Sequence, residues 1–203
     1  VTALSVDTLI SRATFDTWCR SSFDMGGVIR TNEALIIDGQ LVTGDFHLPS
    51  TVHRINDDVF YYCPGLTGMH FPVSVDTIGQ VFGTDYKDHI YTYEGTIEQW
   101  CRMVHTKALR FMAYTLRIGE DDLTNLVLPE GLTGISAHAF EAVSNIKHVT
   151  LPSTMTSVPS FAFRACGNIT DVTGGANIRY FGEDCFGECH KIRAFNIPRE
   201  TRY

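Results

Sequence analysis

The stretch Ile146-Lys147-His148-Val149-Thr150-Leu151-Pro152 decides the fold of this chain. Its apolar and polar residues alternate towards its end, as in a short β-strand with one buried face. The proline after Leu151 lacks a backbone N–H, so it ends the ladder of a strand. The stretch therefore predicts a strand that ends at residue 151, after which the chain crosses to the opposite side over residues 157–165 as an irregular or short helical turn.

The same pattern recurs with a step of 23 residues. Prolines mark the step in two blocks: Pro49 and Pro72, then Pro129, Pro152 and Pro198, with Gly175 in the place of the missing one. Residues of similar type also occupy the same positions of each coil, and each such set of positions is called a column. The columns are Phe60, Phe140, Phe163 and Phe186; Cys63, Val143, Cys166 and Cys189; Leu66, Ile146, Ile169 and Ile192; Met69, Val149, Val172 and Phe195. One such coil cannot bury its own apolar side chains, so successive coils stack. We predict an α/β solenoid, a right-handed superhelix of 23-residue coils with stacked short parallel strands.

A longer repetition divides the chain into blocks. The segment 14–20 is echoed by 96–102, and both contain Trp-Cys-Arg. We expect a first block of two coils with its Trp-Cys-Arg helix segment over residues 1–83, an insert over 84–125 and a second block of three coils over 126–203. Together they form one continuous structural domain.

The insert carries its own local signals. The pattern at 89–93 predicts a strand, and 116–128 predicts a hairpin that feeds the next coil. Thr96 and Gln99 have the spacing of a helix capping box, which places a short helix near 97–105. We expect Trp100 on this helix to pack back onto the solenoid.

Composition excludes several classes of protein. The 203 residues are 44% hydrophobic and 19% charged, which is typical of a folded chain with a substantial core. The formal charge of −7 and the scattered Lys and Arg argue against nucleic acid as a partner. No apolar run approaches the roughly 20 residues of a membrane helix. Residues 1–10 lack the basic start of an export signal.

The repeat resembles the BspA-like leucine-rich repeats of host-associated bacteria and some protozoan parasites. The residues that carry the resemblance are Leu151-Pro152, Val158, Ala162-Phe163 and Cys166, then Leu128-Pro129, Ile135 and Ala139-Phe140, with Tyr93 to Trp100 similar to the stretch between repeat blocks. Val143, Cys185 and residues 173–175 depart from the pattern. The resemblance implies a secreted or cell-surface region linked to adhesion, with no shared catalytic residues and no cofactor.

The cysteines have a structural interpretation. Cys189 lies in a buried column and Cys185 fills an alanine position, so we expect thiols that behave as small hydrophobic side chains. The alternatives are a redox or metal pair of Cys185 and Cys189 with His190, or a disulfide between Cys166 and Cys189.

His47 and His70 occupy the same outward position in successive coils, so their rings could stack, bind a metal or sense pH. Two histidines without a third ligand make a poor zinc site, and we expect no metal site. The acidic clusters at 57–58, 120–122 and 183–184 lack calcium-loop spacing and are expected to be solvated turns. The glycosylation pattern at 168–170 is too short to be specific.

Alternation alone defines a candidate binding face. Its members are the outward strand positions: His47, His70, His148, Thr150, Asp171, Thr173, Arg193 and Asn196. The face mixes charges and lacks a basic stripe, which favours a protein partner, such as a host extracellular or cell-surface protein, or a glycan.

Three functions remain open. The first is a non-catalytic protein-binding or adhesion module, and the second is a structural spacer that displays another domain and has no ligand. The third, a hydrolase or metalloenzyme, lacks a catalytic motif to anchor it, so we expect no enzyme. A repeat array needs polar caps, and neither end carries an obvious one, so we expect neighbouring sequence or self-association to cover the ends.

Overall fold

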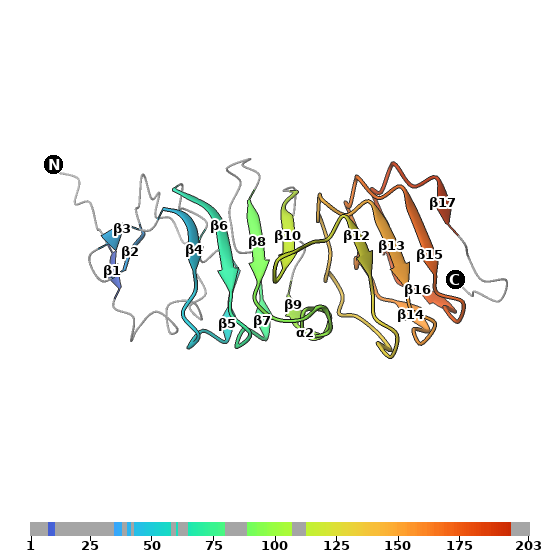
Figure 1. Cartoon of the computed structure of the whole chain (residues 1–203), viewed down its shortest axis with the longest axis horizontal. Helices are drawn as coiled ribbons and strands as arrows, with labels where there is room; N and C mark the ends of the chain where they lie inside the picture. The colour runs from blue at the N-terminus through green and yellow to red at the C-terminus, as the bar shows by residue number, and fades with distance from the viewer. Residues whose placement is uncertain are drawn as a thin grey trace.

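The computed structural model describes residues 43–57, 60, 65–79, 89–106 and 113–195, together with the backbone of short strands over 8–10, 35–37 and 40–41. The strands follow one another in chain order along the long axis of the molecule (Figure 1). They form a right-handed solenoid of coils spaced by about 23 residues, so the predicted architecture is confirmed.

Two larger sheets dominate the described part of the chain. The first contains β4 (Gly44–His47), β6 (Leu66–Phe71), β8 (Ile90–Tyr93), β10 (Thr115–Ile118) and β11 (Asp121–Asp122). The second contains β12 (Asn125–Val127), β13 (His148–Leu151), β15 (Asp171–Gly174) and β17 (Ala194–Phe195). All neighbouring pairs in both sheets are parallel except β10 and β11, which form a hairpin.

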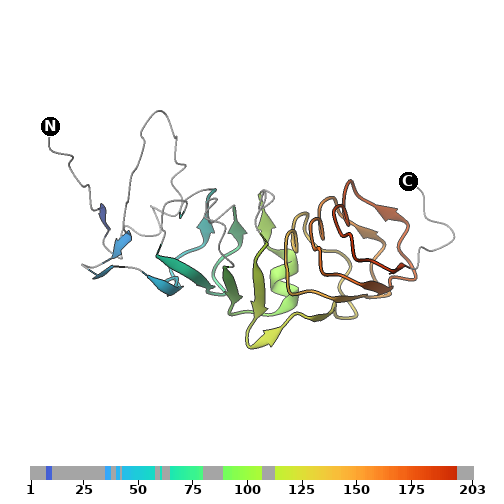
Figure 2. The same ribbon diagram turned by 90° about the horizontal axis from the view of Figure 1, so that it is seen from above.

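Smaller sheets run along another wall of the solenoid. One contains β5 (Arg54–Ile55), β7 (Thr77–Ile78) and β9 (Val104–His105), and another pairs β14 (Ser157–Val158) with β16 (Tyr180–Phe181). A further sheet joins β1 (Thr8–Ile10), β2 (Leu35–Ile37) and β3 (Gln40–Leu41). Figure 2 shows this layered arrangement from above.

The pairing of β14 with β16 corrects part of one expectation: the sequence predicted an irregular or short helical turn over 157–165, but residues 157–158 form a strand and only the rest of the range is a turn. Val158 is fully buried and Phe181 packs against the same core. The same position in adjacent coils therefore lies close enough for backbone hydrogen bonds. A two-residue strand carries too little alternation to be seen in a sequence.

The predicted columns form the core. Phe140 and Phe163 are fully buried and their rings stack with centroids 5.2 Å apart. Phe163 and Phe186 continue the stack at 5.0 Å, although Phe186 is only partly buried. Cys63 lies outside the described residues. Each ring meets its counterpart one coil away, which is why one residue type recurs at a 23-residue step.

Each coil of the second block turns through two left-handed residues that are not glycine. His138, Phe161 and Asp184 form one such column, with φ between 48° and 63°. Ala142, Ala165 and Glu188 form the other, with φ between 58° and 62°. The left-handed region is costly for residues with a Cβ, so the stacked coils impose this conformation on the chain.

The segment 84–125 contributes strands to the first sheet and one helix. β8 pairs in parallel with β6 on one side and with β10 on the other, so both strands extend the same sheet. Helix α2 (Ile97–Arg102) begins at the predicted capping box and ends three residues earlier than expected. Trp100 is buried, and its indole N–H donates to the Ala139 carbonyl at 2.8 Å, so the predicted packing onto the solenoid is confirmed.

Candidate functional site

The outer face of the second sheet presents two rows of side chains, each crossing adjacent strands. Asn125, His148, Asp171 and Ala194 are in register in the first row. Val127, Thr150 and Thr173 are in register in the second. Between the rows, Leu126, Val149 and Val172 point into the core. The alternation predicted for this face therefore places His148, Thr150, Asp171 and Thr173 together.

Polar contacts connect the rows across the strands. His148 Nδ1 lies 2.6 Å from Asp171 Oδ2, and the Thr170 hydroxyl donates to the same carboxylate oxygen at 2.9 Å. These hydrogen bonds, from Thr170 first and then His148, lower the pKa of Asp171. The hydroxyls of Thr150 and Thr173 lie 3.3 Å apart. The side chains thus hold one another in place before any partner binds.

Two members of the predicted face, Arg193 and Asn196, belong to the last coil. Ala194 is in register with Asp171, whereas the Arg193 backbone N–H bonds to the Thr170 carbonyl. Arg193 is exposed, but it lies one residue before Ala194, which occupies the position in this row. The assignment of Arg193 to the row is therefore corrected. The alternation was counted from the wrong residue in the last coil. Asn196 lies outside the described residues.

The outer face of the first sheet carries the two predicted histidines. His47 and His70 are in register on β4 and β6, and their rings stack with centroids 3.7 Å apart at an interplanar angle of 18°. The predicted stacking is confirmed. His70 Nε2 lies 2.9 Å from Asp45 Oδ2, and His47 Nδ1 lies 3.6 Å from Glu94 Oε1.

The sequence analysis missed Asp45 and Glu94. Asp45 reaches His70 across Gly68, where an added Cβ would come within 2.7 Å of Asp45 Oδ1. Glu94 follows β8 and is fixed by its backbone N–H, which donates to the Phe71 carbonyl at 2.9 Å. β8 pairs with β6 at a step of 22 residues, since Phe71 is in register with Tyr93, so the 23-residue repeat does not predict the position of Glu94.

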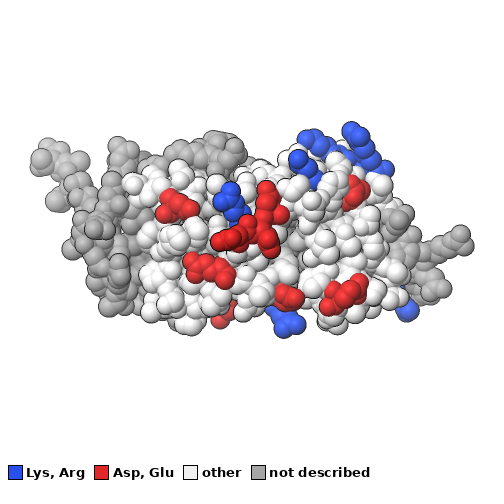
Figure 3. Space-filling view, viewed as in Figure 1, with Lys and Arg blue, Asp and Glu red and all other residues white. Residues whose placement is uncertain are grey.

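A surface hollow lies where the two larger sheets meet. It has a volume of about 660 Å³ and lies between the start of α2 and the β10–β11 hairpin, with Glu98, Glu120, Asp121 and Asp122 among its lining residues. Figure 3 shows acidic side chains in the middle of the view and basic side chains gathered over the upper ends of β13 and β15. The described surface therefore mixes both signs of charge.

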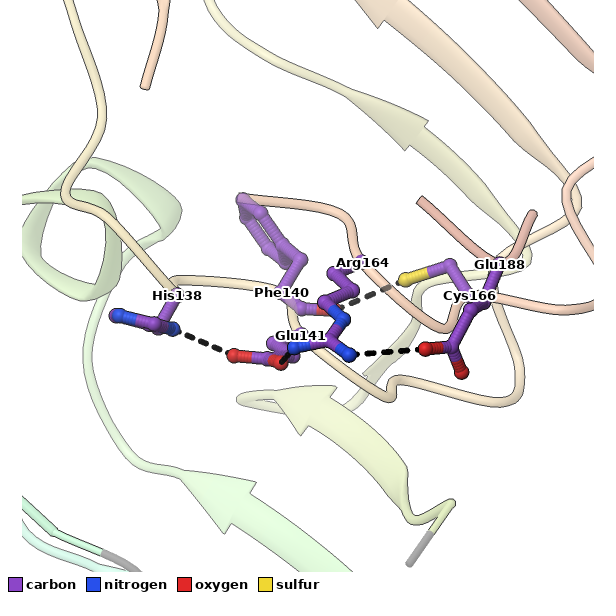
Figure 4. Close-up of polar contacts among 6 residues, drawn as sticks. All are labelled: His138, Phe140, Glu141, Arg164, Cys166 and Glu188. Atoms are coloured by element: carbon purple, nitrogen blue, oxygen red, sulfur yellow. Dashed lines mark hydrogen bonds and ion pairs between the residues drawn. The ribbon is translucent and has the colours of Figure 1, made fainter. Parts of the chain in front are cut away.

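A buried carboxylate on another wall belongs to a polar cluster that spans neighbouring coils (Figure 4). Glu141 lies 2.5 Å from His138 Nδ1 and 4.0 Å from the Arg164 guanidinium, which also bonds to Glu188 at 2.9 Å. Burial raises the pKa of Glu141, and the His138 and Arg164 contacts oppose that shift. His138 lies in the same coil as Glu141, whereas Arg164 and Glu188 come from the next two coils, so the cluster joins successive coils. Sequence reasoning did not find it.

The described thiols are buried and unbridged. Cys101, Cys166, Cys185 and Cys189 are all free. Cys166 and Cys189 each donate to a phenylalanine carbonyl of an adjacent coil, Phe140 at 2.9 Å and Phe163 at 3.0 Å. Burial raises the pKa of Cys185 and Cys189 to about 11. Such thiols carry little thiolate near neutral pH, which agrees with the structural interpretation of the cysteines.

The remaining sequence features have local structural roles. Asn168 donates its side-chain N–H to the Ser144 carbonyl at 2.8 Å, so the nitrogen of the glycosylation pattern is already engaged. Asp122 accepts from Thr124 and Asn145, and these bonds lower its pKa. Across the described ranges, no helix has the length and apolar character needed to span a membrane.

The repeat matches a known protein family. The model of the BspA type leucine rich repeat region matches six copies, over residues 42–83 and 119–203. The chain belongs to this family. The match covers more than half of the chain, so the resemblance predicted from its motifs is confirmed and the solenoid is a leucine-rich-repeat solenoid.

Solved structures similar to this leucine-rich-repeat chain include two bacterial proteins. One is a leucine rich cell surface protein from Faecalibacterium prausnitzii A2-165, with 20% identity and a TM-score of 0.39 over 73% of this chain and 46% of that one. The other is the T. pallidum leucine rich repeat protein, with 21% identity and a TM-score of 0.38 over 73% of this chain and 77% of that one. The chain thus spans less than half of the first. No curated protein matches it.

Proposed function

We propose that this leucine-rich-repeat chain is a non-catalytic module that binds a protein or a glycan through the outer face of its sheets. The observation that carries the proposal is the pair of rows on β12, β13 and β15, where side chains from successive coils lie side by side and open to solvent. A leucine-rich-repeat solenoid of this type is consistent with protein interaction.

The chemistry of the rows favours a protein or glycan partner. Val127 is 62% exposed and lies beside Thr150, so an exposed apolar side chain is next to hydroxyl groups. His148 and Asp171 add a hydrogen-bonded pair made of an imidazole and a carboxylate. Aliphatic, hydroxyl and charged groups in one patch match a protein surface or a sugar better than a phosphate backbone, which requires clustered positive charge.

We place this module in a secreted or cell-surface protein that adheres to host extracellular or cell-surface molecules. The support is the family membership together with the cell-surface description of the Faecalibacterium prausnitzii neighbour. Self-association through the ends of the solenoid is a further part of the proposal. Both ideas go beyond the geometry of the sheets.

A binding screen tests the proposal. The wild type is applied to immobilised extracellular-matrix proteins and glycans beside a face variant, H148A/T150A/D171A/T173A. The matched control is R179A/Y180A, which changes two exposed residues at β16 on a different wall. We expect a saturable signal for the wild type and the control that the face variant loses. Silence of all three proteins would favour the spacer function, and equal signals would move the site elsewhere.

A further inference from the structure

A cluster of metal-ligand side chains lies on the outer face of the first sheet, away from the rows on β12, β13 and β15. His47, His70 and Glu94 each offer one ligand atom, and these atoms all lie within 4.8 Å of one another. Within the part of the chain that the structure describes, this is the one group of three His, Cys, Asp or Glu side chains with that spacing. The sequence had supplied only two of its members.

We propose that His47, His70 and Glu94 bind a single Zn²⁺ ion. Two imidazoles and one carboxylate are a known ligand set for zinc, which then keeps a fourth position open for water or another ligand. Hard cations such as Ca²⁺ and Mg²⁺ prefer sites built only from oxygen, so the two imidazoles select against them. The inference does not depend on the proposed binding function.

The surroundings of His70 support this assignment. A metal-bound histidine commonly donates its other ring N–H to a carboxylate, which orients the ring and raises its basicity. Asp45 Oδ2 lies 2.9 Å from His70 Nε2 and provides such a partner. Gly68 leaves the space that the Asp45 carboxylate occupies, since a Cβ there would come within 2.7 Å of Oδ1.

The distances require only a local adjustment. Tetrahedral zinc with bonds of about 2.1 Å places its ligand atoms roughly 3.4 Å apart, and His47 Nδ1 is already 3.6 Å from Glu94 Oε1. The stacked rings cannot both point their lone pairs at one ion, so one ring has to rotate. His47 is the ring that can move, because its side chain is 65% exposed against 21% for His70.

Metal binding here would connect successive coils. His47 and His70 lie on β4 and β6, and Glu94 directly follows β8. An ion held by these residues ties three neighbouring strands on their solvent side. Its open coordination position faces solvent, where a side chain of a partner could complete the shell.

The chain offers a matched control for this site. His148 and Asp171 form the corresponding exposed pair in the second sheet, 2.6 Å apart, but belong to no three-ligand group among the described residues. Replacing His148 therefore removes an exposed sheet-face histidine without touching the proposed site.

Isothermal titration of tag-free, metal-free protein with zinc chloride at pH 7.5 tests the proposal. We expect one high-affinity equivalent per chain, which H47A and E94Q weaken at least tenfold and H148A leaves unchanged. D45N should keep the stoichiometry and weaken the affinity by about 10–100-fold. Calcium chloride in excess should not displace the zinc.

Circular dichroism of every variant is the folding control. We expect H47A and E94Q to be folded, because the side chains of His47 and Glu94 are exposed. The absorption spectrum of the cobalt-substituted wild type should show tetrahedral Co²⁺ bands that H47A lacks. Absence of zinc binding to the wild type would overturn the proposal. So would retention of full affinity in H47A and E94Q, which would place the ion elsewhere on the chain.

Discussion

His148 and Asp171 lie directly opposite each other on adjacent parallel strands, with Nδ1 and Oδ2 2.6 Å apart. Their separation in the sequence is one coil, so the contact exists only because the coils stack in register. The pair is the clearest sign that the outer face is an ordered surface whose side chains contact one another.

The Asp171 carboxyl should titrate below its ordinary pKa of 3.8. A lowered folded-state pKa stabilises the protein above the pKa of the unfolded chain, and this contribution is lost as the pH falls through the folded value. Carbon-detected NMR should show the Asp171 pKa rising in T170V and, to a smaller extent, in H148A. A Thr170 variant with the wild-type titration would contradict the hydrogen-bond assignment.

Removal of one ring from the phenylalanine stack should destabilise the whole repeat block. Phe163→Ala leaves a cavity between Phe140 and Phe186 and should lower the free energy of unfolding by about 3–5 kcal/mol. Phe186→Ala should cost less, because Phe186 is only partly buried. Urea denaturation followed by circular dichroism measures both. Equal losses in the two variants would show that burial does not govern this column.

Trp100 should join α2 to the second block through one hydrogen bond. Trp100→Phe preserves much of the packing but leaves the buried Ala139 carbonyl without its donor, which should cost about 1–3 kcal/mol of stability. Val104→Ala is the control, because Val104 is 54% exposed. The urea midpoints of the two variants test the difference. A Trp100→Phe midpoint at the wild-type value would show that this hydrogen bond does not stabilise the protein.

His105 should make the protein less stable in mild acid. Burial, the largest cause, lowers the pKa of His105 from 6.5 to about 4. The unfolded chain therefore takes up a proton before the folded one, and stability falls as the pH drops below about 6.5. Between pH 7 and pH 5 the loss should be about 2 kcal/mol, and His105→Gln should lack this component. A wild type and variant with the same pH profile would contradict the lowered pKa.

The buried thiols should resist alkylation in the folded protein. Burial raises the pKa of Cys101 to about 12 and raises the pKa of Cys166 well above its ordinary value. Mass spectrometry after iodoacetamide treatment at pH 8 should find Cys101, Cys166, Cys185 and Cys189 unmodified in buffer and modified in urea. Rapid modification of Cys166 or Cys189 in buffer would indicate a reactive pair instead of structural thiols.

Repetition made most of the fold predictable. Phe140 and Phe163 contact each other because they occupy one position of successive coils, so a count of 23 residues locates a contact in space. The paired strands β14 and β16 escaped notice because two residues carry too little pattern. Arg193 was placed one residue off its row because alternation near the last coil was counted without a pairing register.

The candidate sites were less predictable, for a different reason. His47 and His70 share a column, and the sequence placed them together correctly. Glu94 belongs to a segment where the 23-residue step breaks, so only the backbone pairing of Glu94 with Phe71 brings it to the histidines. Glu141 and Arg164 share a repeat position, and each is followed or preceded within one coil by left-handed residues that the alternation of a sequence does not reveal.

Methyl cross-saturation by NMR with a bound partner tests the central proposal most directly. The deuterated chain carries protonated Val and Thr methyl groups, and the partner's protons are irradiated. The account predicts the greatest signal loss at Val127, Thr150 and Thr173 on the outer face, and none at Thr156, which is exposed next to β14. Loss at Thr156 with unchanged signals at Val127, Thr150 and Thr173 would contradict a binding function for this face.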